Sequence, residues 1–230
     1  MKHYQFETHC HTSEVSRCGV LTADEIVYGL KKADYMGAFI TDHFYSRFFD
    51  KRDIKRLAWR EQAGRYLAGY RAAKKLGDEL GLKIFLGLEV MPDGSPYEFL
   101  IYGPDEQFIT DSGPFYRLSV PELYRLTREN GFLMFQAHPY RYGRSASDPA
   151  FLDGVEIVNS QPRHESRNRL AMKFAFDHDL MIIGGGDVHM EGDIGRGGIM
   201  LPGGINSVRD FIDYYKDVRR PELIVTFEHN

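Results

Sequence analysis

The sequence predicts an α/β fold built as a single domain over residues 1–230. Short runs rich in β-branched and aromatic residues alternate with segments of helical periodicity, which is typical of parallel strands joined by right-handed crossovers. The chain length is ordinary for one α/β barrel. No repeat, low-complexity tract or Ser/Gly linker divides the sequence.

The strand candidates are short apolar runs, and in a parallel arrangement each strand should deliver the loop that follows it to the same face. They cover residues 3–8, 37–41, 83–88, 97–102, 132–137, 154–158, 180–184 and 223–227. Helix boundaries are predicted from capping signals. Thr22 and Glu25 form a capping-box pattern, and a longer helix over 56–80 should end at Gly81. Further helices are expected from Ser119 to Asn130, over 166–177 and over 207–216.

The composition is that of a soluble globular protein, with 43% hydrophobic and 27% charged residues. A net charge of −4 argues against a nucleic-acid binder held by electrostatics. The sequence shows neither a signal-peptide core nor a run of about eighteen apolar residues, so we expect no membrane span and a cytoplasmic location. Cys10 and Cys18 are too few for a disulfide scaffold and suit a reducing compartment.

The side chains that carry chemistry follow the ends of predicted strands. His9 and His11 follow the first strand as His-Cys-His, and alternate strand residues share a face, so both rings could bind one ion. Later strands are followed or ended by His43, Glu89, His138, Asp187 and His189. Histidines used separately as caps or core residues would be scattered over helices and both strand ends. Because α/β folds build their sites at the carboxyl ends of parallel strands, this placement predicts a metal site.

Five motifs resemble, in their order and spacing, those of the PHP (polymerase and histidinol phosphatase) family: His9-x-His11, Thr41-Asp42-His43, Gly87-Leu88-Glu89, Ala137-His138-Pro139 and Gly186-Asp187-Val188-His189. The resemblance implies a distorted (β/α)7 barrel with a metal cluster at the C-terminal mouth of the strands. It also implies a phosphoesterase that uses two or three divalent metal ions, with Zn, Mn or Fe admissible, and a metal-activated hydroxide as the nucleophile.

The resemblance further implies a first metal held by four side chains, His9, His11, Glu89 and Asp187. Glu89 would bridge to a second metal that is also bound by His138. Where many family members place another histidine, this chain has Glu98, which could replace it as a harder ligand or could be a solvated strand residue.

A third metal would take His43 and His189. The family usually adds a His or Asp from the loop after His-x-His, but the loop of this chain, residues 12–19, is longer and contains neither. Glu14 or Cys18 could substitute there, or the third site could be weak.

Arginines should orient a phosphoryl group by paired hydrogen bonds. Arg141 resembles the family's phosphate-side arginine, and Arg17, Arg144 and Arg163 are loop candidates that could equally be surface charges.

Four other polar residues could support catalysis. Asp42 could fix an imidazole tautomer, and His164 could protonate the leaving group. Glu156 and Asn159 lie at the same strand edge and should support ligands rather than bind metal. The remaining histidines are expected to be structural or solvated: His3, His178 and His229.

These residues predict a phosphoesterase acting on a small phosphate ester, either a phosphomonoester or a nucleotide. A nuclease acting on single-stranded nucleic acid is an alternative that would need a basic and aromatic groove. Arg163, Arg167 and Arg169 favour it mildly, whereas the acidic net charge argues against it. A non-catalytic metal-binding module is a second alternative, and the complete ligand set argues against it.

The converging His and carboxylate side chains lead to a first prediction. Protein purified without chelator should contain at least two transition-metal ions per chain, because mixed nitrogen and oxygen ligands suit Zn, Mn and Fe. Elemental analysis measures this directly. A metal-free protein that also fails to take up added metal would refute the metal site.

Overall fold

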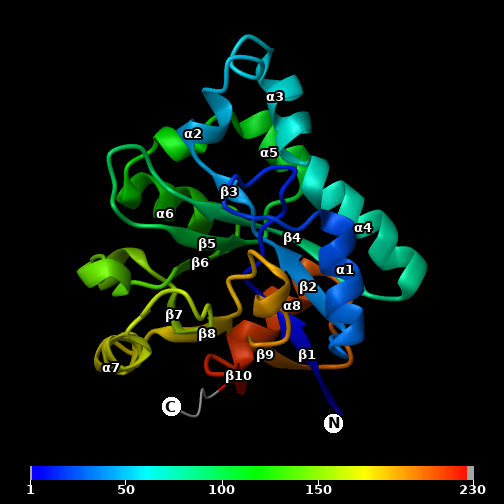
Figure 1. Ribbon diagram of the computed structural model, residues 1–230. Helices are drawn as coiled ribbons and strands as arrows, with labels where there is room; N and C mark the ends of the chain where they lie inside the picture. The colour runs from blue at the N-terminus through cyan, green and yellow to red at the C-terminus, as the bar shows by residue number, and fades with distance from the viewer. Residues whose placement is uncertain (1, 227–230) are drawn as a thin grey trace.

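The strands form one mixed sheet that curls into a nearly closed barrel, in a computed structural model that describes residues 2–226 (Figure 1). The strands are β1 (His3–Glu7), β2 (Gly37–Ile40), β3 (His43–Phe44), β4 (Lys83–Val90), β5 (Phe99–Tyr102), β6 (Leu133–Gln136), β7 (Gly154–Asn159), β8 (Met181–Gly185), β9 (Gly197–Pro202) and β10 (Leu223–Val225). Their order is β10-β9-β1-β2-β4-β5-β6-β7-β8, and β3 continues the line of β2 along β4.

The helices within the described residues are α1 (Ala23–Lys32), α2 (Ser46–Phe49), α3 (Trp59–Tyr66), α4 (Ala68–Leu80), α5 (Glu106–Ser112), α6 (Val120–Glu129), α7 (Asn168–Asp177) and α8 (Val208–Asp217). Short 3₁₀ turns are η1 (Phe115–Arg117), η2 (Arg141–Gly143), η3 (Pro149–Phe151) and η4 (Glu191–Asp193). Helix α1 packs against α4, which covers β2 and β4, and α7 packs on β7 (Figure 1).

The hydrophobic core consists of separate clusters, because successive side chains of a strand point to opposite faces of the sheet. One set of buried strand residues packs with α8, whose Phe211 ring lies 4.6 Å from that of Phe39 and whose Tyr215 ring lies 5.3 Å from that of Phe135. Other buried residues, such as Leu88 and Ile157, pack in a separate cluster that includes helix residues. Because side chains alternate between the two faces of a strand, each strand contributes to both sides of the sheet.

The predicted fold class, an α/β barrel, is confirmed. The capping box at Thr22 is also present, with its hydroxyl accepting from the Glu25 backbone N–H while the Glu25 carboxylate accepts from the Thr22 N–H. Gly81 ends α4 with φ of 70°, a left-handed conformation that glycine adopts without strain. The helix predicted over 56–80 is two helices, because the chain turns at Leu67.

The expectation that all strands run parallel is wrong. Strand β5 is antiparallel to both β4 and β6, and β9 is antiparallel to β1 and β10. The connection from β4 to β5, residues 91–98, is shorter than the dozen or so residues that a parallel crossover needs. The start of β5, rather than its end, therefore lies at the edge where the parallel strands end.

Other elements were not predicted. These are β9, whose glycines Gly197 and Gly198 weaken a strand pattern, and the helices α2 and α5. The last residue of the strand candidate 223–227 and His229 lie outside the described residues. Within residues 2–226, no helix combines the length and the apolar character that a membrane span requires.

Closure of the barrel depends on close approach of backbones near Gly197. A Cβ atom at this position would lie 2.5 Å from both the carbonyl carbon and the oxygen of Gly185. We therefore expect Gly197→Ala to lower the free energy of unfolding by about 1–3 kcal/mol, because backbone must shift to accept the methyl group. Urea denaturation measures the change, with exposed Gly204→Ala as the control, where nothing lies within 4 Å. Equal stability of the two variants would contradict the role of Gly197.

Candidate metal centre

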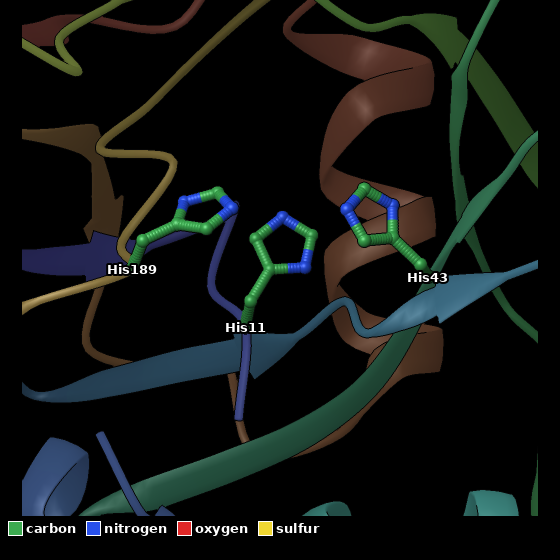
Figure 2. A group of neighbouring side chains, drawn as sticks. All are labelled: His11, His43 and His189. Atoms are coloured by element: carbon green, nitrogen blue, oxygen red, sulfur yellow. The ribbon is translucent and has the colours of Figure 1, made fainter. Parts of the chain in front are cut away.

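The candidate ligands come together at the edge where the parallel strands end. Their donor atoms form four overlapping groups within 4.8 Å: His9, His11 and Asp187; His9, Glu89 and His138; His43, Glu89 and Glu98; and His11, His43 and His189. Figure 2 shows His11 between His43 and His189, and its ring centroid lies 4.4 Å and 4.5 Å from theirs. Glu98 reaches this edge because β5 is antiparallel and the residue immediately precedes it.

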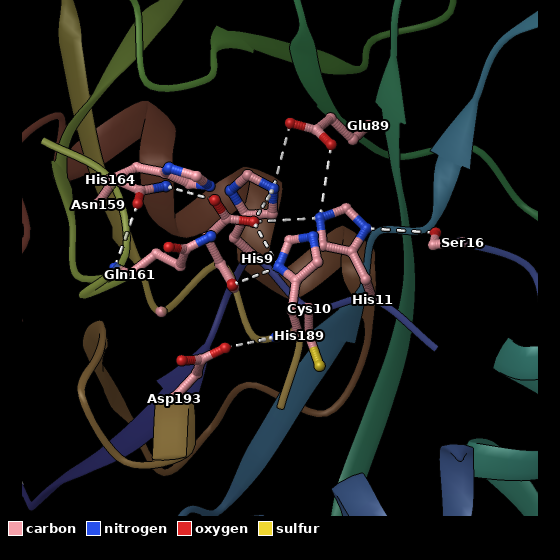
Figure 3. Close-up of polar contacts among 12 residues, drawn as sticks. His9, Cys10, His11, Ser16, Glu89, Asn159, Gln161, His164, His189 and Asp193 are labelled. Atoms are coloured by element: carbon pink, nitrogen blue, oxygen red, sulfur yellow. Dashed lines mark hydrogen bonds and ion pairs between the residues drawn. The ribbon is translucent and has the colours of Figure 1, made fainter. Parts of the chain in front are cut away.

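Glu89 contacts four of the histidines, and Figure 3 shows its carboxylate facing the rings of His9 and His11. Its Oε1 atom is 3.2 Å from Nε2 of His9 and 3.1 Å from Nε2 of His138. Its Oε2 atom is 2.7 Å from Nδ1 of His43 and 3.5 Å from Nε2 of His11. The two oxygens thus face different histidines, which is the arrangement that a carboxylate bridging two ions requires.

Asp187 is the second buried carboxylate at this edge. Its Oδ1 atom lies 3.4 Å from Nε2 of His9 and 3.3 Å from Nε2 of His11. The backbone is in the left-handed region at Asp187, with φ of 52°, and at His138, with φ of 25°. Such conformations are costly for residues other than glycine and concentrate at functional sites, where the surrounding structure holds them.

Three ring nitrogens at the centre are buried without a hydrogen-bond partner: His9 Nε2, His11 Nε2 and His43 Nδ1. Carboxylate oxygens lie near them, but not in hydrogen-bond geometry. Buried polar atoms in folded proteins are nearly always paired. Three unpaired nitrogens in one place therefore indicate a site for a ligand such as a metal ion. Mixed imidazole and carboxylate donors fit Zn, Mn or Fe, so the residues present fit a cluster of divalent ions.

The electrostatics of the cluster favour cations. Burial alone would lower the pKa of His9, but the charges of Asp187, Glu156 and Glu89 outweigh it and raise the pKa well above its ordinary value. Burial alone would raise the pKa of Glu89, but the charges of His43 and His9 and hydrogen bonds outweigh it and hold the pKa well below its usual range. The carboxylates therefore stay ionised and attract positive charge.

Comparisons with known proteins match a part of the chain to a family model and its fold to solved structures. Residues 165–219 match a family described as PHP-associated. Comparison with curated proteins finds no match. A two-domain protein from Bacteroides vulgatus that contains a predicted PHP-like metal-dependent phosphoesterase is 17% identical, with a TM-score of 0.61 over 92% of this chain and 63% of that chain. The match over residues 165–219 and the shared fold agree with the resemblance of the sequence motifs to the PHP family.

Two further solved structures share the fold. PsfC from Pseudomonas syringae is 16% identical, with a TM-score of 0.66 over 98% of this chain and 93% of its own. The lesion-specific endonuclease PfuEndoQ from Pyrococcus furiosus is 12% identical, with a TM-score of 0.59 over 94% of this chain and 56% of its own. At these identities the likeness concerns the fold, and the chemistry has to be argued from the residues of this chain.

Hydrogen bonds from neighbouring residues orient the candidate ligands. Glu156 Oε1 lies 2.9 Å from Nδ1 of His9, and Glu156 Oε2 accepts a 2.9 Å bond from the backbone N–H of His138. Nδ1 of His189 lies 2.8 Å from the carbonyl oxygen of Asp187. In both rings the contact occupies Nδ1 and directs Nε2 toward the cluster, as for histidines that bind metal in proteins.

Asp42 acts differently from the expectation that it fixes an imidazole tautomer directly. Its carboxylate accepts hydrogen bonds from Thr12 and from the Ser16 hydroxyl, each 2.7 Å long. The Ser16 oxygen in turn lies 3.4 Å from Nδ1 of His11 and accepts a bond from the backbone N–H of His43. Asp42 therefore acts on His11 and His43 through Ser16.

Glu7 was not recognised from the sequence. It is fully buried at the end of β1, and its Oε1 atom accepts bonds from the backbone N–H groups of Thr8, His9 and Gly186. Burial raises its pKa to about 8, although these hydrogen bonds oppose the rise. An ionisable residue at the end of the first strand, two positions before His9, was the available signal.

Three predicted site residues make their contacts elsewhere. The Glu14 carboxylate accepts from the backbone N–H of Ala23 at the start of α1, so the structure does not bring Glu14 to the cluster. His164 bonds the hydroxyl of Tyr142. Arg163 forms a bidentate ion pair with Asp193. The loop after His11 turns Glu14 toward the helix because that carboxylate caps its first turn.

Arg141 is buried against the cluster rather than exposed to a substrate. Its Nη2 atom lies 2.6 Å from Oδ2 of Asp187 and 2.6 Å from Oδ1 of Asn159. Together with Ser166, these partners occupy one end of the guanidinium group. Arg141 therefore positions Asp187. The geometry does not favour the expected role of Arg141 in binding a phosphoryl group.

A cavity of about 410 Å³ opens beside the cluster. It is lined by Arg17, Cys18, His43, Tyr45, Arg47, Met91, Glu98 and Arg144. Two of these residues, His43 and Glu98, are candidate ligands, and three are arginines from separate segments of the chain. The sequence analysis included Arg17 and Arg144 but missed Arg47, which follows the short strand β3 and has no motif around it.

Cys18 lines the same cavity as His43. Partial burial would raise the pKa of its thiol, but interactions with the His189 and His43 rings outweigh it and lower the pKa to about 6.

The contacts of Glu156 lead to a prediction about metal affinity. Glu156→Gln should weaken metal binding by about 10–100-fold, because it loosens the ring of His9 and the backbone of His138. Competition with a chromogenic chelator measures the affinity. The control is Glu106→Gln, which changes an exposed ion pair with Arg71. Unchanged affinity in folded Glu156→Gln would show that this carboxylate does not support the ligands.

Proposed function

We propose that the protein hydrolyses a small phosphate ester, a phosphomonoester or a nucleotide, with divalent metal ions held by the cluster. The observation that supports this most is the cavity in which Arg17, Arg47 and Arg144 stand beside His43 and Glu98. Guanidinium groups bind phosphate oxygens with paired hydrogen bonds. A cluster of candidate metal ligands with three arginines on its rim is therefore suited to an anionic phosphorylated substrate.

The metal ligands, the arginines of the cavity and Arg141 would have different roles in the reaction. Metal ions bound at the cluster would lower the pKa of a water molecule and neutralise charge on the phosphoryl group. The three arginines would hold the phosphate oxygens and the rest of the substrate in the cavity. Arg144 lies 3.4 Å from Oε2 of Glu98, so it can move between this carboxylate and a substrate anion at the same edge. Arg141 would keep Asp187 in place.

The size of the cavity favours a small substrate. Sites for small molecules are commonly clefts of about 300–1,000 Å³, and the cavity is at the lower end of that range. A nucleic-acid strand would instead need a continuous basic groove with aromatic platforms.

A nuclease is the second candidate, and two observations favour it. One is the fold shared with the endonuclease from Pyrococcus furiosus. The other is a second cavity of about 420 Å³, lined among other residues by Arg163 and Arg167, which precede α7, and by Arg196, which precedes β9. Arg163 is bound by Asp193 there, which makes this surface less available to a strand.

Small-ester hydrolysis and strand cleavage differ in their salt dependence. We predict turnover of small phosphate esters with added manganese or zinc, and modest inhibition by salt. A nucleic-acid strand that contacts several basic residues would lose affinity steeply as the salt concentration rises, because the release of counterions on binding then contributes less free energy. A panel of monoesters, nucleotides and single-stranded oligonucleotides, assayed from low to high salt, separates the two functions.

Two variants accompany this assay. Glu89→Gln should reduce activity by at least about a hundredfold, because the metal pair loses its shared carboxylate. Arg144→Ala should reduce kcat/KM about tenfold through lost charge-assisted hydrogen bonds, whereas Arg60→Ala, in an exposed ion pair with Asp111, should not. Efficient strand cleavage with no turnover of small esters would replace the phosphatase by the nuclease.

A further inference from the structure

We propose that Tyr142 is a platform on which the planar base of a nucleotide stacks, so that the small phosphate ester bound by this chain is a nucleotide rather than a sugar phosphate. This inference deepens the proposed function and rests on it only in that the ligand carries a phosphate group. It concerns the part of the ligand beyond the ester bond. An aromatic side chain can bind any base by stacking, because every base has a π-face.

Tyr142 combines an exposed ring with a strained backbone. The residue is 67% exposed, so burial of its ring contributes little to the stability of the fold. Its backbone is in the left-handed region, with φ of 56° and ψ of 27°, which is unfavourable for a bulky residue. Such strain is maintained mainly at functional sites. A tyrosine that is both exposed and strained therefore indicates a role other than folding.

Two neighbouring side chains hold the ring in position. The Tyr142 hydroxyl lies 3.0 Å from Nδ1 of His164, and the two rings meet edge to face with their centroids 5.0 Å apart. The guanidinium carbon of Arg144 lies 6.0 Å from the centroid of the Tyr142 ring. A ring that is already oriented loses little conformational freedom when a ligand binds to it.

The same two contacts place Tyr142 between the two cavities. Arg144 lines the cavity beside the candidate metal ligands, and His164 lines the second cavity together with Asn159 (Figure 3). Arg144 also lies 3.4 Å from Oε2 of Glu98. A phosphate held by Arg144 at the cluster would therefore have its alcohol group on the side of the Tyr142 ring.

The loop that carries Tyr142 is fixed relative to the cluster. The backbone N–H of Arg141 donates to the carbonyl oxygen of His138, and the N–H of Arg144 donates to that of Arg141, each over 3.1 Å. The Arg141 side chain is buried and binds Asp187. The ring and the candidate metal ligands are thus parts of one connected structure.

Tyr45 also lies beside the cluster, but it is placed differently. It lines the cavity of the three arginines and packs against the hydrophobic core, with its ring 5.1 Å from that of His43. Tyr45 is therefore a wall of the proposed phosphate cavity, whereas the ring of Tyr142 is accessible to a base.

Two phosphonates that differ in the base test the proposal. One is the analogue of AMP in which a methylene group replaces the ester oxygen, and the other is the same analogue of ribose 5-phosphate. Neither can be hydrolysed at the changed bond. Titration calorimetry on metal-loaded protein measures both dissociation constants. We expect the adenosine compound to bind at least about tenfold more tightly, because stacking of one base contributes an effect of this size.

Three variants identify the residue responsible. Tyr142→Asn removes the ring but introduces a residue that accepts a left-handed backbone, so the loop should stay folded. It should weaken binding of the adenosine compound about tenfold, and the loss should be confined to that compound. Tyr142→Phe keeps the ring and should keep the preference. Tyr28→Ala is the matched control, because Tyr28 is a 58% exposed tyrosine on α1.

Three results would overturn the proposal. The first is equal affinity of the wild type for the two phosphonates, and the second is an unchanged preference in Tyr142→Asn. The third is an equal loss for both compounds in Tyr142→Asn, because the ring would then support the loop instead of binding a base. If Tyr142→Asn weakens binding of a single-stranded oligonucleotide but not of the adenosine compound, the base belongs to a strand and the nucleotide assignment is wrong.

Failure of the inference can be distinguished from failure of the proposed function. A protein that hydrolyses small phosphate esters but does not prefer the adenosine compound refutes the platform and retains the proposed function. A protein that prefers the adenosine compound through Tyr142 but hydrolyses no phosphate ester refutes the proposed function and retains the platform.

Discussion

Glu89 lies among four imidazole rings with only 1% of its surface exposed, and its negative charge has to be compensated there. An unpaired buried charge costs several kcal/mol. The histidines compensate it partly, but three of their ring nitrogens remain without hydrogen bonds. Positive ions between these nitrogens and the carboxylates would satisfy both sets of atoms, so the arrangement of the barrel mouth follows from one electrostatic requirement.

Much of the surrounding structure holds this cluster in position. Glu156 contacts His9 and His138, and Asp42 acts on His11 through Ser16. Glu7 accepts hydrogen bonds from backbone N–H groups that follow β1 and β8. Each of these carboxylates is buried and accepts hydrogen bonds from its neighbours. Buried polar networks of this kind are costly when incomplete, so they tie the orientation of the ligands to the integrity of the barrel.

The sequence predicted those features of the fold and the site that depend on local patterns of residues. The position of His9, His11 and Glu89 follows from alternation along strands and from the common edge at which parallel strands end. The capping box at Thr22 is encoded in four consecutive residues. These features need no knowledge of distant contacts.

Other features depend on contacts between distant segments. The burial of Arg141 against Asp187 and the turning of Glu14 toward α1 are tertiary contacts that no local pattern encodes. The antiparallel course of β5 could have been inferred from its short connection, whereas Arg47, in α2, lines the cavity through a tertiary placement that no motif marks. Sequence reasoning thus located the edge and the residue types, and the structure supplied the orientation of the individual side chains.

The central claim is that divalent ions occupy the space between Glu89, Asp187 and the histidines. Anomalous scattering from crystals grown with zinc, measured on both sides of its absorption edge, tests this most directly. The account predicts anomalous peaks at about 2.0–2.3 Å from Nε2 of His9 and His11 and from the Glu89 carboxylate. Zinc peaks only at other positions, with the cluster empty in a protein that still hydrolyses phosphate esters, would contradict it.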